Sequence, residues 1–152
     1  MTGSEPDVAV INFSANSAAF RNSQEFRESI ENLINQLPPG TPCIWMTNPP
    51  TSHRVVSNAV LEETQNKILE VLNDMGSAGK ARCHFIPGIT ADSKRDFSLN
   101  SNYLARDKLH LSSRGARYWF NEIVKPDLCQ NVQTLFNHGE NGNLTGEQIQ
   151  EN

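Results

Sequence analysis

The sequence predicts a mixed α/β fold built on a short parallel sheet. Three short apolar runs have the composition of buried strands, and amphipathic stretches at helical spacing separate them. Alternation of this kind is typical of parallel strands joined by right-handed helical crossovers. The strands are expected at residues 8–13, 43–46 and 83–86, and the helices at about 23–37, 56–75 and 113–124.

Local signals mark the ends of two of these helices. Asn22 stands three residues before Glu25, which resembles a capping box, and Pro38 ends the apolar stripe of the first helix. Ser112 is the expected N-cap of the last helix, and Pro126 is expected to close it. The inner face of the last helix is predicted to consist of Ala116, Trp119, Phe120 and Ile123.

Length and composition predict one domain followed by a polar tail. A chain of 152 residues is long enough to bury a core without disulfides or metals. Residues 1–126 are expected to form the domain, whereas the stretch 127–152 is rich in Asn, Gln and Gly and predicts a weakly ordered tail. The odd, sparse set of three cysteines is not typical of a disulfide framework. We interpret Cys43 and Cys83 as buried thiols on neighbouring strands.

Charge and hydropathy narrow the classes of partner. The net charge is −4, from 13 basic and 17 acidic residues, and no basic patch stands out, so no nucleic-acid partner is expected. No stretch approaches the roughly 18 consecutive apolar residues of a membrane span, so no membrane partner is expected. The first residues lack the features of a secretory signal, so the compartment stays unknown and the cytoplasm is the default expectation.

Candidate site residues gather in three polar loops. In parallel sheets of this kind the ligand site lies beyond the carboxyl ends of the strands. The loops expected there are 14–22, 47–53 and 88–110. We interpret 88–106 as a long polar loop without helix, and loops of this length are usually functional. His53, in the second loop, is either part of a cleft or an exposed loop histidine.

Asp107 and His110 form the most suggestive pair, because they stand three residues apart just ahead of a capped helix. A carboxylate at this offset can accept a hydrogen bond from the imidazole Nδ1–H and leave Nε2 free to act as a base. Two alternatives remain open: a surface aspartate beside a structural histidine, and a pair of metal ligands. Because no further ligand residues follow at metal-binding spacing, we expect no metal and no other cofactor.

The segment 103–115 resembles the last conserved block of the SGNH (GDSL-type) hydrolases, Asp-x-x-His-Leu-Ser/Thr-x-x-Gly, which an aromatic helix follows. Every fixed position of that block is matched here, and residues 118–120 supply the aromatic side chains. The resemblance implies a flavodoxin-like, three-layer α/β/α fold and hydrolysis of a small acyl or acetyl ester. It also implies that His110 is the general base and Asp107 its orienter.

A second block agrees more loosely. The strand at 8–13 leads into Ser14-Ala15-Asn16-Ser17, which is similar to the family's strand ending in Gly-x-Asn-Asp. Asn16 occupies the position of the asparagine whose amide donates to the oxyanion of the tetrahedral intermediate. Ser14 replaces the usual glycine, and Ser17 replaces the usual aspartate.

The nucleophile block of the family, Gly-Asp-Ser-Leu, has no counterpart in this chain. It would precede the asparagine block by several dozen residues, and only 15 residues precede Asn16. The resemblance therefore implies an SGNH fold that lacks its first strands and an esterase without an identifiable nucleophile. Ser14 and Ser17 are the candidate substitutes, because they lie near the end of the first strand.

Three further interpretations remain open. The chain is a fragment of a full SGNH enzyme, a non-catalytic interaction or scaffold module derived from one, or a half that another chain completes. In each case the strand at 8–13 lacks, within this chain, the neighbour that it has in the family fold. An edge with unpaired backbone groups and no proline or lysine is a template for pairing, so a homodimer through residues 8–13 is expected.

Overall fold

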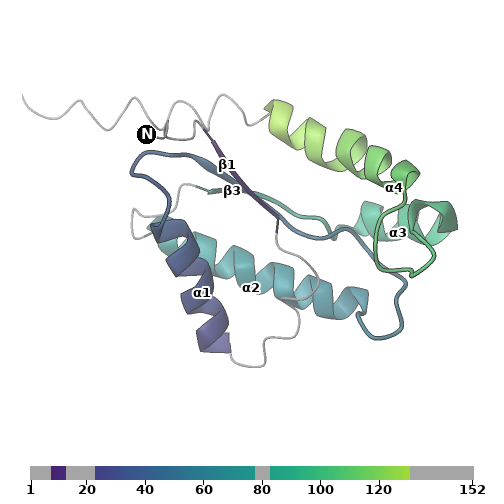
Figure 1. The fold of residues 1–152 in the computed structure, drawn as a ribbon, viewed down its shortest axis with the longest axis horizontal. Helices are drawn as coiled ribbons and strands as arrows, with labels where there is room; N and C mark the ends of the chain where they lie inside the picture. Colours follow the sequence, from purple (N-terminus) through teal and green to yellow (C-terminus); the bar gives the residue numbers. More distant parts are fainter. Residues whose placement is uncertain (1–7, 13–22, 78–82, 131–152) are drawn as a thin grey trace, which may run out of the picture.

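A three-stranded parallel sheet lies between two layers of helices (Figure 1). The computed structural model describes residues 8–12, 23–77 and 83–130. The predicted three-layer α/β fold with a short parallel sheet is confirmed. The elements in chain order are β1 (Ala9–Asn12), α1 (Ser23–Asn35), β2 (Cys43–Met46), α2 (Asn58–Ser77), β3 (Cys83–Ile86), α3 (Ala91–Leu99), η2 (Ser101–Tyr103), α4 (Ser113–Tyr118) and the π-helix η3 (Trp119–Val124).

The strand order β1-β2-β3 places β2 in the middle and β1 at one edge. Cys43 of β2 pairs with Ala9 of β1 on one side and with Cys83 of β3 on the other. The first three residues of β2 are buried, as in a parallel strand covered on both faces. In β1, by contrast, Val10 is 61% exposed.

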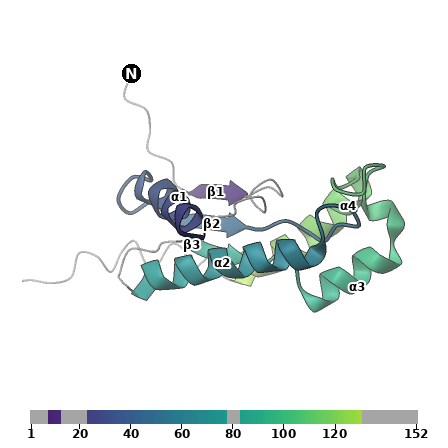
Figure 2. The same cartoon turned by 90° about the horizontal axis from the view of Figure 1, so that it is seen from below.

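The layer formed by α1 and α2 covers one face of the sheet (Figure 2). Trp45 from β2 belongs to the apolar core on this face and has no exposed surface. The predicted stripe of the first helix supplies much of this core. Its buried members are Phe26, Ile30, Ile34, Trp45, Ile68, Val71, Leu72 and Met75.

The opposite face of the sheet is covered by α3, α4 and η3. Here the alternate residues of the strands, among them Ile44 and Ile86, meet Phe97 of α3 and Trp119 of η3. Since successive strand residues point to opposite faces, each strand contributes to both cores. The loop between η2 and α4 is thereby held at the end of the sheet to which the strands point (Figure 2).

The prediction of a long loop at 88–106 is wrong, because α3 and η2 occupy most of it. Thr90 caps α3 by accepting a hydrogen bond from the backbone of Ser93, and the Ser93 side chain accepts one from the backbone of Thr90 in return. Phe97 is the one large apolar side chain that α3 buries. Because α3 has a single large apolar residue on its buried face, its hydrophobic periodicity is too weak to distinguish it from a polar loop in the sequence.

The last helix begins where the sequence predicts, with Ser112 as its N-cap, but the predicted end at Pro126 is wrong. Residues 119–124 form a π-helix, and residues 125–130 are helical again. The backbone N–H of Lys125 donates to the carbonyl of Phe120, five residues earlier. This wider turn directly precedes Pro126, whose ring would otherwise clash with the carbonyl four residues before it.

The π-helix also changes which side chains of the last helix face the core. Gly115, Trp119 and Val124 are buried, and the step of five residues from Trp119 to Val124 matches a π turn. The predicted inner residues Ala116 and Phe120 are exposed instead. The predicted tail therefore begins inside a helix, and residues 131–152 lie outside the described part of the chain.

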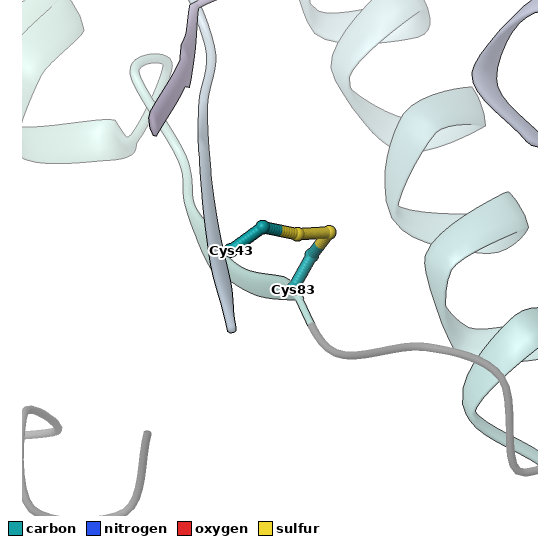
Figure 3. The surroundings of a disulfide bond; sticks show 2 residues. All are labelled: Cys43 and Cys83. Atoms are coloured by element: carbon teal, nitrogen blue, oxygen red, sulfur yellow. A yellow bond between two sulfur atoms is a disulfide. The ribbon is translucent and has the colours of Figure 1, made fainter. Parts of the chain in front are cut away.

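Cys43 and Cys83 form a disulfide, so the prediction of two free thiols is wrong (Figure 3). The two cysteines are register partners on the neighbouring strands β2 and β3, so their side chains point to the same face of the sheet. Their neighbouring placement agrees with the prediction, but the register that brings the sulfurs together is not visible in the sequence. Cys129 is a free, exposed cysteine.

Within the described part, no helix is both long and apolar enough to cross a membrane.

Candidate active site

Asp107 and His110 belong to the tight loop that joins η2 to α4. This loop lies beyond the carboxyl ends of the strands (Figure 2). Leu104 and Leu111 form an antiparallel bridge at the base of this loop. The backbone N–H of Ala105 donates to the carbonyl of His110 at 2.8 Å, and the N–H of Lys108 donates to the carbonyl of Ala105 at 3.0 Å. We refer to residues 105–110 as the Asp–His loop.

The two site side chains make the contact that the sequence predicts. The imidazole Nδ1–H of His110 donates to Oδ2 of Asp107 at 2.6 Å. The second carboxylate oxygen, Oδ1, accepts the backbone N–H groups of Leu109 and His110, both at 3.0 Å. One carboxylate thus binds the ring and fixes the turn that presents the ring.

The electrostatics of the pair follow from these contacts. The hydrogen bond from His110, followed by the two backbone N–H groups, holds the pKa of the Asp107 carboxyl well below its usual range. Asp107 is therefore ionised throughout the neutral range. The His110 side chain is 75% exposed, and no hydrogen bond reaches its Nε2 from the described residues.

The loop between β2 and α2 forms hydrogen bonds to the backbone of the Asp–His loop. Lys108 adopts a left-handed conformation with φ of 61°. Its carbonyl accepts a hydrogen bond from the Thr51 hydroxyl at 2.5 Å and another from the Ser52 backbone N–H at 3.0 Å. Asn58, the first residue of α2, holds Thr51 in turn, since its Oδ1 accepts the Thr51 backbone N–H at 2.7 Å.

The remaining fixed residues of the sequence block have structural tasks. The Ser112 hydroxyl accepts the Gly115 N–H at 3.1 Å and donates to the carbonyl of Asn102 at 2.5 Å, so it joins α4 to the end of η2. Gly115 packs directly on the backbone of Tyr103. A Cβ at position 115 would lie 1.9 Å from the Tyr103 carbonyl oxygen, so the close approach of helix and loop requires glycine here.

Aromatic side chains fix the helices on either side of the Asp–His loop. The rings of Tyr103 and Tyr118 stack at 4.5 Å between centroids, and Phe97 contacts both edge-on. The Tyr118 hydroxyl donates to the carboxylate of Asp96 on α3, which lowers the pKa of Asp96. Burial, together with this carboxylate, raises the pKa of Tyr118 far above its usual range. Tyr118, part of the aromatic stretch after the block, therefore supports the scaffold of the loop.

A buried polar network holds the ends of β2 and β3 together beneath these loops. The Thr47 hydroxyl donates to Gln65 Oε1 at 2.8 Å and accepts the Gly88 N–H at 2.8 Å. Gln65 of α2 also accepts the N–H of Ile89 and donates to its carbonyl, both at 2.9 Å. This role of Gln65 was not predictable from the sequence, because a glutamine within an apolar helix face has no distinctive pattern.

The other predicted site residues are placed less fully. Asn16, Ser14 and Ser17 lie outside the described residues, so their relation to His110 stays a prediction. The Nδ1 of His53 accepts the backbone N–H groups of Val55 and Val56, which leaves the ring proton on Nε2. No group of three or more His, Cys, Asp or Glu residues that could hold a metal ion occurs within the described ranges.

Comparison with known proteins gives a likeness of fold. No protein-family model and no curated protein matches the sequence. Among solved structures, the chain resembles a family two carbohydrate esterase from Clostridium thermocellum, an active-site mutant in complex with celluohexase, with a TM-score of 0.62 and 16% sequence identity. The two share a fold. The match covers 84% of this chain but 36% of the esterase chain, so this chain spans just over a third of that protein's length.

Proposed function

We propose that this chain is the Asp–His part of an SGNH (GDSL-type) serine esterase, which hydrolyses small acyl or acetyl esters. The main support is the hydrogen bond of 2.6 Å from His110 Nδ1 to Asp107 Oδ2, which leaves Nε2 on an exposed face. The match of residues 103–115 to the last SGNH block and the fold likeness to a carbohydrate esterase point the same way.

In this proposal His110 Nε2 accepts the proton of an attacking hydroxyl group and later returns it to the leaving group. Asp107 holds the ring in the Nδ1–H tautomer and stabilises the imidazolium that forms during the reaction. Its low pKa suits this role, because the carboxylate keeps its negative charge while the ring gains a positive one. The amide of Asn16 would donate to the oxyanion of the tetrahedral intermediate.

Neither the sequence nor the described residues identify the nucleophile of this reaction. Ser14 and Ser17 follow the first strand in the sequence and are the substitutes that we propose. The alternative is that the serine comes from another chain, which would complete the sheet beside β1. The fraction of the esterase neighbour that this chain matches, 36% of its length, is compatible with a part of a larger catalytic unit.

Hydrolysis of p-nitrophenyl acetate by the whole chain tests the proposal. We expect a low turnover that disappears in His110→Ala and falls in Asp107→Asn, because both changes remove the oriented base. His53→Ala is the matched control, since His53 also lies in a loop at this end of the sheet but has no carboxylate partner among the described contacts. Equal rates in all four proteins would contradict the esterase assignment.

A second candidate function is a non-catalytic interaction module. One observation favours it: β1 is an edge strand in which Val10 is 61% exposed, and within the described residues no strand pairs with its outer side. An open edge of this kind is suited to pairing with a further strand. This function predicts association without ester turnover, so the assay above separates the two candidates.

A further inference from the structure

We infer that Thr51 is a positioning residue for the Asp107–His110 pair, acting through the backbone carbonyl of Lys108. The inference rests on the proposed function for its purpose, since it assigns a task toward the base of that reaction. Thr51 comes from the loop after β2, whereas the pair lies more than fifty residues later, between η2 and α4.

The first step concerns the backbone at Lys108. This residue stands between Asp107 and His110 and is in the left-handed region, with φ of 61°, which a non-glycine residue enters at a cost of about 1 kcal/mol. The conformation persists only if neighbouring contacts hold it. Two such contacts converge on its carbonyl, from the Thr51 hydroxyl and from the Ser52 backbone N–H.

The second step concerns what the left-handed turn achieves. It folds the chain back so that the backbone N–H groups of Leu109 and His110 both point at Oδ1 of Asp107. The same turn brings the His110 ring to Oδ2. Because the side chains of the pair are 49% and 75% exposed, packing alone does not restrain them. Their alignment depends on the turn.

The third step concerns the support of Thr51 itself. Thr51 is buried, with 7% of its surface exposed. Its hydroxyl donates to the Lys108 carbonyl and accepts the backbone N–H of His53 at 3.1 Å. Its own N–H donates to Asn58 at the start of α2. A line of hydrogen bonds thus runs from the long helix α2 through Thr51 to the Asp–His loop, and it ties an exposed pair to a rigid element.

The tautomer of the His110 ring tests this role without reference to turnover. The hydrogen bond to Asp107 selects the Nδ1–H form of the neutral ring, and a loosened pair would release it toward the Nε2–H form. Nitrogen-15 correlation spectra of the whole chain, recorded where histidines are neutral, report the ratio of the two forms. Asp107→Asn provides the reference for a ring without its carboxylate.

We expect Thr51→Val to lower the Nδ1–H to Nε2–H ratio roughly fivefold, the effect of one net hydrogen bond, and Thr51→Ser to restore it. The fall is partial because the Ser52 N–H still reaches the Lys108 carbonyl. Thr64→Val is the matched control: it also removes a threonine hydroxyl that donates to a backbone carbonyl, that of Val60, but within α2. We expect it to leave the ratio unchanged.

A folded Thr51→Val protein that keeps the wild-type ratio would overturn the inference. If that variant does not fold, Asn58→Ala and Asn58→Asp replace it, because the first removes the acceptor for the Thr51 N–H and the second retains it. The inference then requires a lower ratio in Asn58→Ala and recovery in Asn58→Asp, and equal ratios would overturn it. A wild-type ester rate equal to that of His110→Ala would contradict the proposed function and leave the tautomer result intact.

Discussion

The Nδ1 of His110 and the Oδ2 of Asp107 lie 2.6 Å apart, and the other oxygen of the same carboxylate is bound by two backbone N–H groups. All three hydrogen bonds favour the ionised form of Asp107 and lower its pKa. The folded pKa therefore lies below the unfolded one. The ionised carboxylate adds stability above the ordinary pKa of an aspartate, and this stability is lost as the pH falls through the lower folded value.

The first prediction concerns this pKa. His110→Ala removes the largest cause of the shift, so the pKa of Asp107 should rise toward its usual range but stay below it, because the two backbone N–H groups remain. A titration followed by the carbon-13 shift of the Asp107 carboxyl group measures the change. His53→Ala is the control and should leave the titration as it is. An unchanged curve in His110→Ala would show that the ring does not contribute.

The second prediction concerns the nucleophile. We expect a fluorophosphonate probe to label the chain slowly and substoichiometrically, since losing the serine of a catalytic triad costs roughly 10⁶-fold in kcat. Intact-mass spectrometry measures the labelled fraction. Rapid, stoichiometric labelling would contradict the prediction. In that case Ser14→Ala and Ser17→Ala would identify the serine that reacts, and His110→Ala should slow the reaction.

The third prediction concerns the glycine of the sequence block. Gly115→Ala should destabilise the fold by about 1–3 kcal/mol, because the added methyl group has to push α4 away from the backbone of Tyr103. Urea denaturation measures the loss, and the spectrum of His110 should change as its loop shifts. Gly40→Ala is the control, since a Cβ there meets nothing within 4 Å. This variant should lose only the stability that a positive φ costs a residue other than glycine. The spectrum of His110 should not change.

The fourth prediction concerns the disulfide. Cys43 and Cys83 are 40 residues apart in sequence, and a crosslink closing a loop of this length stabilises a fold by about 4 kcal/mol in the chain-entropy treatment. Reduction should therefore lower the urea midpoint of the wild type. The double variant Cys43→Ala, Cys83→Ala should not respond to reductant, and Cys129→Ser should respond as the wild type does. Equal midpoints with and without reductant would contradict the prediction.

The fifth prediction concerns association. We propose that the chain forms a homodimer by pairing of its β1 edges, so its sedimentation coefficient should rise with concentration. Val10→Lys should abolish the rise, because the twofold pairing would bring two lysines together on the exposed edge strand. Val55→Lys is the matched control, since Val55 is a valine outside the strands that is 82% exposed. A wild-type monomer at every concentration would contradict the proposal.

The fold could be predicted from the sequence because its signals are regular. Strands buried on both faces are almost wholly apolar, and α1 shows its stripe at each turn, so alternation alone indicates the layers. The contact of Asp107 with His110 was predictable because residues 103–115 resemble the last SGNH block, and partners three residues apart need only one turn between them.

The features that could not be predicted depend on contacts between distant segments. The Cys43–Cys83 bond follows from the register of β2 on β3, which the composition of the two strands does not specify. Thr51 meets Lys108 because two loops converge at one end of the sheet, although 57 residues separate them. The helix beyond Pro126 follows a π turn, which avoids the clash of the proline ring with the carbonyl four residues before it.

The left-handed turn at Lys108 has a consequence for mutational scanning. Its described contributions to the Asp–His loop come from its backbone carbonyl oxygen and its backbone N–H, which every amino acid except proline possesses. An alanine scan would therefore report position 108 as unimportant, whereas a change to proline, which excludes positive φ, would collapse the turn. Replacing the amide bond between residues 108 and 109 with an ester, which weakens that carbonyl as an acceptor and also removes the Leu109 N–H that donates to Asp107, would expose backbone contributions that side-chain substitution does not detect.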